Sequence, residues 1–372
     1  MKNIKVPFFN YPHVYKQYSH IIKPKLFSTI ERGAYILQNE LFEFEKNLAK
    51  FLRAKYAIGV ADGTNAILLS LRALGMKKGD EAIISSHTYI ATASAIHDAG
   101  GTVVVIDCKN DFMMDENKIE KAINKKTKFI IPTQLNGRVC NMDKILKIAK
   151  KYKLKVVEDG AQSIGAKYKN KYSTTFGVTG TLSFYPAKIL GSFGDGGAII
   201  TNDKFTADKL LKLRDHGRDK DGKVVSWGTN SRLDNLQAVV LNAKLKYLKK
   251  DLNRRREIAK IYNDGLNKIK SLILPPGPDI NSSNYDVYQN YEILADKRNS
   301  LKKYLYKKGI GTLIQWNGQP IHSIKGIKVK KSSYKKTDDI FKKILMLPMN
   351  TSLTNFQINY VIKSIKEFYN ER

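Results

Sequence analysis

The chain of 372 residues is long enough to bury a complete hydrophobic core, and we expect one large domain and a smaller one. Hydrophobic residues make up 42% and charged residues 27%, which is typical of a globular protein in solution, and no apolar run is long enough to cross a membrane. The first seven residues lack the apolar core of a signal peptide, so the sequence predicts a cytoplasmic protein. Cys108 and Cys140 are the only cysteines, and their spacing predicts neither a disulfide framework nor a metal site.

A formal net charge of +31 is the most unusual feature of the composition, and it is a feature that many nucleic-acid-binding proteins share. The lysines are, however, spread over predicted helices, as at 144–155 and 302–308. The densest stretch, Lys244 to Arg256, has the pattern of the solvated face of a helix. We therefore expect no nucleic-acid partner, although a basic surface could help to attract a phosphate-bearing small molecule.

The N-terminal half has the pattern of a layered α/β domain. After a segment rich in proline and aromatic residues we expect a helix from about Val14 and a second helix at Leu41–Leu52, where apolar residues recur at helical spacing. Short apolar runs then alternate with helical patterns, which predicts a mostly parallel sheet covered on both faces, with ligands outside the carboxyl ends of its strands. The expected strands are 56–60, 81–85, 102–107, 128–133 and 155–158, and the expected helices are 65–74, 88–99, 116–124 and 143–152.

Two more strands, at 181–185 and 197–201, continue this domain, and a helix to about Asp215 follows them. After a polar loop at 216–229, residues 232–267 contain no proline and a single late glycine. We expect one long helix there that connects two domains.

The tetrapeptide Pro275-Pro-Gly-Pro278 separates this helix from a small α+β domain. The sequence therefore predicts a large domain of residues 1–250 and a small domain of residues 251–372. In the small domain we expect strands at 288–294, 311–316 and 345–348, helices at 297–308 and 355–369, and a basic loop before residue 345.

The first strand runs into Ala61-Asp62-Gly63-Thr64-Asn65, which opens a helix. Free N–H groups and the helix dipole at such an N-terminus favour an anion, so Gly63 and Thr64 are candidate phosphate ligands. The segment is not a P-loop, because no Gly-Lys-Ser/Thr follows. A simple helix cap would explain the same residues, and the motif alone leaves both interpretations open.

A later strand ends in Glu158-Asp159-Gly-Ala-Gln162. Because adjacent residues of a strand point to opposite faces, one of the two carboxylates can face a ligand site. A carboxylate at this place could keep the ring nitrogen of pyridoxal 5′-phosphate (PLP) protonated. A helix cap or an ion pair with one of the many lysines is the alternative interpretation.

The segment Ser183-Phe-Tyr-Pro-Ala-Lys188 places a single lysine after an aromatic-proline corner and before a glycine-rich stretch. A lysine becomes a nucleophile when its surroundings lower its pKa, and a Schiff base with a carbonyl cofactor is the usual reason. Tyr89, after the second strand, could stack on a flat ring or belong to the core. Together these motifs could bind PLP. They comprise a phosphate-binding turn, an aromatic residue, an Asp–Gln pair and a Ser–Lys pair.

With these motifs in this order, nearly the whole chain resembles the DegT/StrS-type sugar aminotransferases, the sugar-nucleotide branch of the type I PLP fold. The resemblance implies that Lys188 forms the Schiff base and then moves protons, and that Asp159 pairs with the pyridine nitrogen. It implies that Gln162 contacts the hydroxyl side of the ring and that Tyr89 stacks on its face. The phosphate would be held by Gly63, Thr64 and Ser183.

The segment Gly228-Thr-Asn230-Ser-Arg232 resembles the part of the family that reaches into the neighbouring subunit. The resemblance therefore implies a homodimer with shared active sites, in which Asn230 contacts the phosphate of the partner. Arg232 is a candidate for binding a carboxylate of the donor or substrate, and Tyr185 is a candidate substrate contact. Some members of the family have a histidine in place of this lysine and catalyse dehydration. Because this chain has Lys188, the resemblance favours transamination, with L-glutamate as donor.

The motifs look most like those of members that aminate C3 of a nucleotide-linked 3-keto sugar. One departure concerns the acceptor: where many relatives have His-Tyr-Pro, this chain has Gln315-Trp316-Asn317-Gly-Gln-Pro320, with His322 further on. Because this segment lines the sugar-nucleotide pocket in the family, Gln315, Trp316 and His322 are candidate substrate contacts, and the departure leaves the acceptor open.

The resulting prediction is an enzyme that transfers an amino group from glutamate to a dTDP-3-keto-6-deoxyhexose for surface polysaccharide biosynthesis. A 4-keto sugar nucleotide is the alternative acceptor. A PLP-binding regulator without turnover is the alternative of a different class, and nucleic-acid binding follows from charge alone. No metal and no membrane partner are expected.

Overall fold

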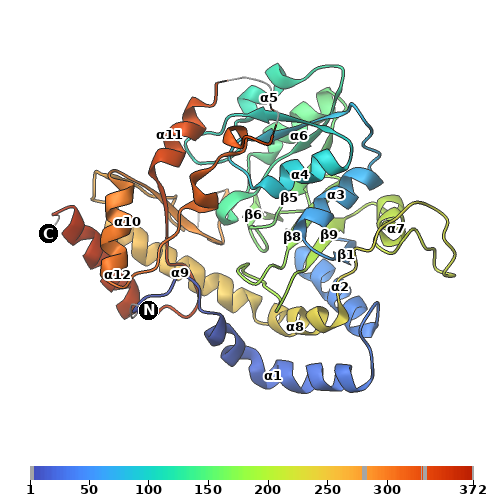
Figure 1. The fold of residues 1–372 in the computed structure, drawn as a ribbon, viewed down its shortest axis with the longest axis horizontal. Coiled ribbons are helices and arrows are strands. Elements are labelled where there is room, and N and C mark those ends of the chain that lie inside the picture. Colours follow the sequence, from blue (N-terminus) through green and yellow to red (C-terminus); the bar gives the residue numbers. More distant parts are fainter. Residues whose placement is uncertain (1–3, 279–282, 328, 330–332, 371–372) are drawn as a thin grey trace.

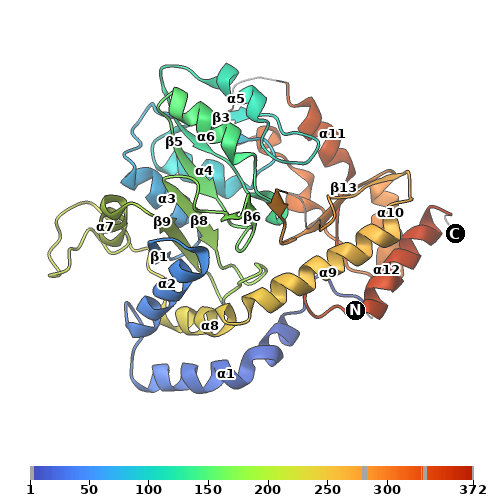
Figure 2. The ribbon, with the colours of Figure 1, turned by 180° about the vertical axis from the view of Figure 1, so that it is seen from behind.

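The computed structural model describes residues 4–278, 283–327, 329 and 333–370. Figures 1 and 2 show a larger layered part and a smaller part near the C-terminus from opposite sides. A helix that runs between the two parts, α9 (Leu248–Leu266), is prominent in both views.

Seven strands form the central sheet of the larger part: β1 (Tyr56–Val60), β2 (Glu81–Ser85), β3 (Thr102–Ile106), β4 (Thr127–Ile131), β5 (Lys155–Asp159), β8 (Thr179–Ser183) and β9 (Gly197–Thr201). Their order across the sheet is β1-β9-β8-β5-β4-β2-β3. β9 is antiparallel to both of its neighbours, whereas the pairs from β8 to β3 are parallel. The predicted mostly parallel sheet is confirmed.

Helices cover both faces of this sheet, so its strands are apolar on both sides. On one face Phe44 and Leu241 belong to the core, and on the other face Ile67 and Leu210 do. The helices of the larger part are α1 (Tyr11–Glu31), α2 (Asn39–Leu52), α3 (Gly63–Ala73), α4 (Ile90–Asp98), α5 (Glu116–Ala122), α6 (Met142–Lys151), α7 (Lys204–Leu213) and α8 (Asn235–Leu245).

The smaller part is built on a three-stranded sheet with the order β10-β12-β13, formed by β10 (Leu272–Ile273), β12 (Tyr291–Ala295) and β13 (Ile344–Leu347). Buried residues such as Tyr262, Tyr291 and Leu345 form its core together with helices. A capping box at Thr354 begins the last of these helices. The helices are α10 (Arg298–Lys307), α11 (Lys335–Lys343) and α12 (Asn355–Phe368). The predicted boundary at residue 250 stays a prediction.

The prediction of one helix over 232–267 was wrong. The chain forms α8 and α9, with a break at Lys246 and Tyr247. α8 packs on α1 and α2, whereas α9 packs on α12 of the smaller part. One straight helix could not follow both surfaces, and Tyr247 at the break packs 5.6 Å, between ring centroids, from Tyr18 of α1.

The predicted strand at 311–316 was also wrong. Leu313 makes one bridge to Met346, after which Trp316 and Asn317 have φ angles of 48° and 55°, which end any strand pairing. The chain there forms a short 3-10 turn at Gln315–Gly318.

The region predicted as a basic loop contains α11, in which Thr337, Ile340 and Phe341 are buried on one side. The other side of α11 carries charged residues. Because they outnumber the apolar residues, the helical spacing of the apolar residues was not apparent in the sequence. The sequence also did not predict a second small sheet, with the order β11-β6-β7, formed by β6 (Lys167–Tyr168), β7 (Lys171–Tyr172) and β11 (Asn284–Tyr285).

None of the helices among the described residues combines the length and the apolar character that a membrane span needs. Within the same described residues, no three His, Cys, Asp or Glu side chains come together as a metal site. Cys108 and Cys140 are both buried free thiols.

Candidate active site

Lys188 lies in a tight turn just after β8, at the carboxyl end of the strand. Its backbone N–H donates to the carbonyl of Tyr185 at 2.8 Å, and the N–H of Phe184 donates to Gly196 at 2.7 Å. Burial lowers the pKa of the Lys188 amine, and the nearby Asp159 carboxylate opposes part of this effect. A lysine with a lowered pKa has more of the uncharged, nucleophilic form at neutral pH.

The side-chain amide of Gln289 holds the peptide groups on both sides of Lys188. Its oxygen accepts from the N–H of Ile189 at 2.9 Å, and its nitrogen donates to the carbonyl of Ala187 at 2.9 Å. Gln289 precedes β12, and the Arg255 guanidinium of α9 donates to its backbone carbonyl at 3.3 Å. The turn that carries Lys188 is therefore fixed by residues next to the smaller sheet.

Asp159 lies at the end of β5, is 4% exposed, and faces the same region as Lys188. The hydroxyl of Thr92 donates to its Oδ2 at 2.6 Å. Thr92 continues into a chain of buried hydroxyl groups, with Thr88 at 2.9 Å and Thr133 at 2.7 Å from Thr88. Together with the N–H of Ala161, which donates to Oδ1 at 3.2 Å, these contacts fix the carboxylate in one orientation.

Glu158 points to the opposite face of β5, as expected from strand geometry. Its carboxylate is fully buried and accepts from the N–H groups of Thr174, Phe176 and Gly177. The amide of Gln134 also donates to it at 2.8 Å. Glu158 is therefore a structural residue, and Asp159 is the carboxylate that faces the site.

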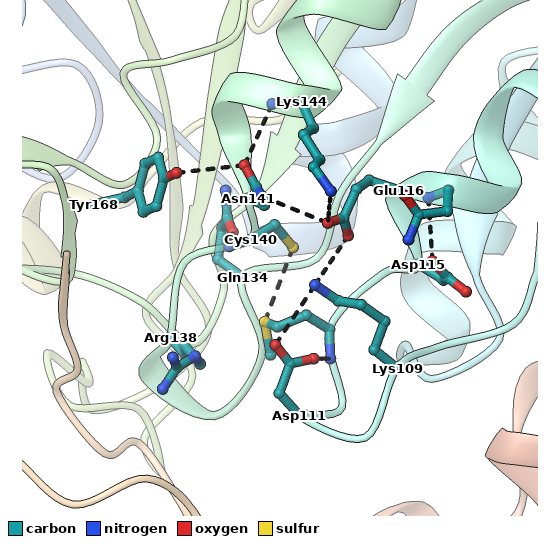
Figure 3. Close-up of polar contacts among 12 residues, drawn as sticks. Lys109, Asp111, Asp115, Glu116, Gln134, Arg138, Cys140, Asn141, Lys144 and Tyr168 are labelled. Carbon is teal, nitrogen blue, oxygen red and sulfur yellow. Dashed lines mark hydrogen bonds and ion pairs between the residues drawn. The ribbon is translucent and has the colours of Figure 1, made fainter. Parts of the chain in front are cut away.

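A second polar cluster lies next to Gln134 (Figure 3). The oxygen of the Gln134 amide accepts from the N–H of Cys140 at 2.7 Å. Nearby, the Glu116 carboxylate pairs with Lys109 at 2.9 Å and with Lys144 at 3.6 Å, and these cations hold its pKa below the usual value although burial opposes them. Figure 3 shows these groups between the loop before α5 and the start of α6.

Gly63 and Ser183 come together at the N-terminus of α3. A Cβ atom at Gly63 would lie 2.8 Å from the Cβ of Ser183, and one at Gly197 would lie 2.3 Å from the carbonyl oxygen of Asp62, so both positions require glycine. The Asp62 carboxylate caps the helix by accepting from the N–H of Asn65 at 2.8 Å. Thr64 is half-buried in the same first turn.

The backbone N–H groups of Gly63 and Thr64 donate to no group among the described residues. They are the free donors that the first turn of a helix leaves. Together with the Ser183 hydroxyl at the end of β8, they form a place suited to an anion.

Gln162 is buried and belongs to a group of amides on the other side of Asp159. Its oxygen accepts from the N–H of Asn136 at 2.7 Å and from the Asn290 side chain at 3.4 Å. Asn290 also donates to the Asn136 side chain at 2.8 Å. The segment that contains Gln289 and Asn290 thus contacts both the Lys188 turn and Gln162.

Aromatic residues lie at the mouth of this region. The rings of Tyr89 and Trp316 have centroids 5.9 Å apart and are tilted by 40°. Tyr89 and Tyr185 are about half exposed, at 51% and 52%, which leaves both available to a ligand. Gln315, directly before Trp316, is 2% exposed and therefore faces inward.

Three of the sequence-predicted residues do not contact this group. Asn230 is exposed and pairs through its backbone with Asp215, and the Arg232 guanidinium forms an ion pair with the Asp215 carboxylate at 3.0 Å. They lie at the base of the loop after α7, which projects from the body in Figures 1 and 2. His322 stacks on Tyr334 at 4.2 Å and hydrogen-bonds Asp338 at 2.9 Å.

Sequence reasoning missed several polar residues of the site. Thr92 lies inside a helical pattern, where threonine carries no signal of its own. Asn136 has a left-handed φ of 56° in a 3-10 turn, which no local spacing indicates. Gln289 and Glu292 reach the site from the smaller part of the chain, and their place follows only from tertiary contacts.

Comparisons with known proteins agree with the family resemblance of the sequence motifs. The sequence profile of the DegT/DnrJ/EryC1/StrS aminotransferase family matches residues 20–366. The dTDP-3-amino-3,6-dideoxy-alpha-D-galactopyranose transaminase of Aneurinibacillus thermoaerophilus is 36% identical over 364 residues, covering 98% of this chain and 99% of that protein. A pleiotropic regulatory protein of Geobacillus stearothermophilus is 36% identical over 372 residues, with coverages of 98% and 99%.

The solved structure of S. venezuelae DesV in complex with a ketimine intermediate is similar to the whole fold. The TM-score is 0.94 at 32% sequence identity, and the superposition covers 99% of each chain.

Proposed function

Because the chain belongs to the DegT/DnrJ/EryC1/StrS aminotransferase family, we propose that it transfers an amino group from L-glutamate to C3 of a dTDP-3-keto-6-deoxyhexose. The product would serve surface polysaccharide biosynthesis. The observation that carries the proposal is the buried turn in which Lys188 faces Asp159. The similarity to a transaminase that forms a dTDP-3-amino-3,6-dideoxy sugar supports the choice of acceptor.

The chain has the fold of the type I PLP-dependent aminotransferases, and PLP is its cofactor. The described residues fit this group, because the free N–H groups at the start of α3 and the close approach of Gly63 to Ser183 form a cradle for its phosphate. In our proposal Asp159 holds the ring nitrogen, Gln162 lies on the hydroxyl side and Tyr89 covers a face. When bound, PLP supplies an electron sink for the carbon that exchanges its amino group.

The residues around Lys188 account for the proton transfers of such a reaction. Burial lowers the pKa of the Lys188 amine and so favours its uncharged form, in which Nζ can accept a proton from substrate and return it to another atom. The Gln289 contacts fix the backbone of the turn, and the lysine side chain therefore starts from a constant position. Thr92 keeps the Asp159 carboxylate directed at its partner.

We further propose a homodimer with shared sites. The loop at 216–229 projects from the body, and Asn230 at its base is exposed and pairs through its backbone with Asp215. This placement supports a role in the site of a second copy, with Asn230 on the phosphate. Arg232 would then meet a carboxylate of the donor, and it would exchange its ion pair with Asp215 for that contact.

The acceptor is the less constrained part of the proposal. In our proposal Tyr185, Gln315 and Trp316 bind the acceptor, whereas His322 is engaged with Asp338 and would act on the acceptor only after leaving this contact. A 4-keto sugar nucleotide is the second candidate of the same class. A regulator that binds PLP without turnover is the candidate of another class. The similarity to a pleiotropic regulatory protein supports this alternative.

Absorbance and product release test these candidates. The PLP-loaded protein is expected to show the visible band of lysine-bound cofactor, which L-glutamate bleaches and which Lys188→Ala lacks. A band that glutamate leaves unchanged would favour the regulator. With a panel of keto sugar nucleotides, 2-oxoglutarate release should be fastest with a dTDP-3-keto-6-deoxyhexose, and a clear preference for a 4-keto sugar would overturn the assignment of C3.

A further inference from the structure

Glu292 of β12 is a fully buried carboxyl group that the roles above do not use. The amide of Asn136 donates to its Oε1 at 3.3 Å. With its amide nitrogen turned towards Glu292, Gln315 also donates to both carboxyl oxygens, at 3.3 Å to Oε1 and closer to Oε2. The Nε2 atom of His87 lies 3.7 Å from Oε1. Glu292 therefore joins the Gln162–Asn136 group to the turn that carries Trp316.

His87 completes the cluster from the end of β2. Its ring is 1% exposed, and neither ring nitrogen has a hydrogen-bond partner among the described residues. The ring packs edge-on against Phe341 at 4.8 Å and Trp316 at 5.5 Å, measured between centroids. A buried nitrogen without a partner is costly, and the hydrogen-bonding side chain that acts on the His87 ring is that of Gln315.

Burial also sets the protonation states of Glu292 and His87. Burial raises the pKa of Glu292 to about 8 and lowers the pKa of His87 to about 3. At neutral pH both groups are then uncharged, so the cluster buries no charge, and the 3.7 Å between Nε2 and Oε1 is a close contact rather than a hydrogen bond. The other polar groups that contact Glu292 are the amides of Asn136 and Gln315, and its partner on β13 is Met346.

The turn that Glu292 contacts has a strained backbone. Trp316 and Asn317 have φ angles of 48° and 55°, in the left-handed region that bulky residues rarely adopt. Such a conformation persists only where the surroundings hold it, and it is typical of functional sites. The buried Gln315 begins this turn and contacts Glu292, and the next residue, Trp316, carries the ring that lies near Tyr89.

We propose that Glu292 is a positioning residue for acceptor binding, which rests on the function proposed above. Its carboxyl group holds Gln315, and through Gln315 it keeps the strained turn in place, so that the Trp316 indole forms the wall against which the keto sugar nucleotide packs. Glu292 touches neither the acceptor nor the cofactor. Its removal should therefore weaken the binding of the acceptor and leave the reaction with glutamate intact.

Separate measurements of the glutamate half-reaction and the acceptor half-reaction distinguish a positioning role of Glu292 from a general structural role. In the PLP-loaded enzyme, Glu292→Ala should raise the KM for the acceptor about tenfold, the effect of losing ~1.4 kcal/mol of binding. The rate at which glutamate bleaches the visible band should stay within about twofold of wild type. Glu292→Gln keeps the size and neutral form of the side chain and should restore most of the acceptor affinity. Glu367→Ala, an exposed glutamate of α12, is the control.

A spectroscopic readout keeps the test independent of turnover. The chain has two tryptophans, Trp227 and Trp316, and Trp227 is 95% exposed. In a Trp227→Phe background the fluorescence therefore reports on Trp316. It should change between about pH 7 and pH 9, as Glu292 loses its proton, and this transition should be absent when Glu292→Gln is added.

Each result has one meaning. A fluorescence transition that requires Glu292, together with a raised acceptor KM and an unchanged glutamate step, supports the proposal. No transition, or an equal loss in both half-reactions of Glu292→Ala, would overturn it. If no keto sugar nucleotide is turned over by the parent enzyme, the proposed function fails, and the fluorescence measurement still decides whether Glu292 holds the Trp316 turn.

Discussion

Gln289 holds Lys188 from about 100 residues further along the chain, by bonding the peptide groups immediately before and after it. Gln289 itself is tied to α9 through the Arg255 guanidinium, which also donates to the carbonyls of Tyr288 and Met349. The position of the reactive amine is therefore coupled to the packing of the smaller sheet. A change in that packing would be felt at the lysine.

Gln289→Leu removes both bonds and leaves the buried carbonyl of Ala187 and the N–H of Ile189 without partners. We expect a loss of stability of about 1–3 kcal/mol, the cost of a buried unsatisfied polar group. The turn should also become less fixed, so that glutamate bleaches the visible band more slowly. Thermal unfolding and stopped-flow absorbance measure the two effects. Gln38→Leu, at an exposed position, is the control, and unchanged stability with an unchanged bleaching rate would contradict the prediction.

Thr92→Val keeps the shape of the side chain but removes the hydroxyl that donates to Asp159 at 2.6 Å. Because a hydrogen bond to a charged group contributes roughly 1.5–3 kcal/mol, we expect PLP affinity to fall by about tenfold or more. Thr88→Val is the matched control, since Thr88 touches Thr92 but not Asp159, and its effect should be smaller. Equilibrium dialysis with PLP measures both affinities, and equal losses in the two variants would show that Thr92 acts only through the hydroxyl chain.

The strands of the central sheet followed from the sequence because each is locally determined. β1 and β2 agree with the predicted bounds to the residue, since their apolar runs end at polar or glycine-rich turns. The break between α8 and α9 and the left-handed turn at Trp316 were not predictable in this way. Both depend on surfaces that meet only in the folded chain, so no local pattern indicates them.

The residues of the candidate site also differ in whether a local sequence pattern indicates them. Asp159 and Lys188 could be proposed from the sequence because each lies at the carboxyl end of a strand, the edge where ligands bind in such sheets. Asn290 and Glu292 come from the smaller part, and their polar side chains lie in a stretch predicted simply as a strand. What makes them part of the site is the docking of β12 against Asn136, which is a long-range contact.

Asn230→Ala should lose PLP retention only if Asn230 serves the site of the neighbouring subunit. Mixing this variant with Lys188→Ala tests the shared site, since a hybrid dimer would contain one site with both intact residues. With random exchange of subunits, about a quarter of wild-type activity should return, because half of the dimers are hybrids with one working site of two. Activity that stays absent after exchange, verified by tagged subunits, would place Asn230 and Lys188 in the same chain's site.

The pH dependence of stability tests the protonation of Glu292. Its pKa is raised from 4.5 to about 8 in the folded protein, so between these values the folded state binds more protons than the unfolded state. The contribution of the carboxyl group to stability is then complete below about pH 4.5 and is lost as the pH rises through 8. His87, with its pKa lowered to about 3, stays neutral in the folded protein but is protonated in the unfolded chain below about pH 6.5, so it adds a slope of opposite sign there. Because His87 is present in both proteins, a comparison of wild type with a Glu292 variant cancels this slope.

Glu292→Gln removes this titration and keeps the neutral form. The Tm of the variant minus that of wild type should therefore grow between pH 5 and pH 8 and then level off, by at least the ~2–4 °C that 1 kcal/mol produces in a domain of 150–250 residues. Differential scanning calorimetry at several pH values measures the gap. Glu367→Gln is the control: the pKa of Glu367 is lowered by Lys308, so its gap should stay flat above pH 5. A gap for Glu292→Gln that stays flat or shrinks between pH 5 and pH 8 would contradict the raised pKa of Glu292, because the folded protein would then bind no extra proton in this range.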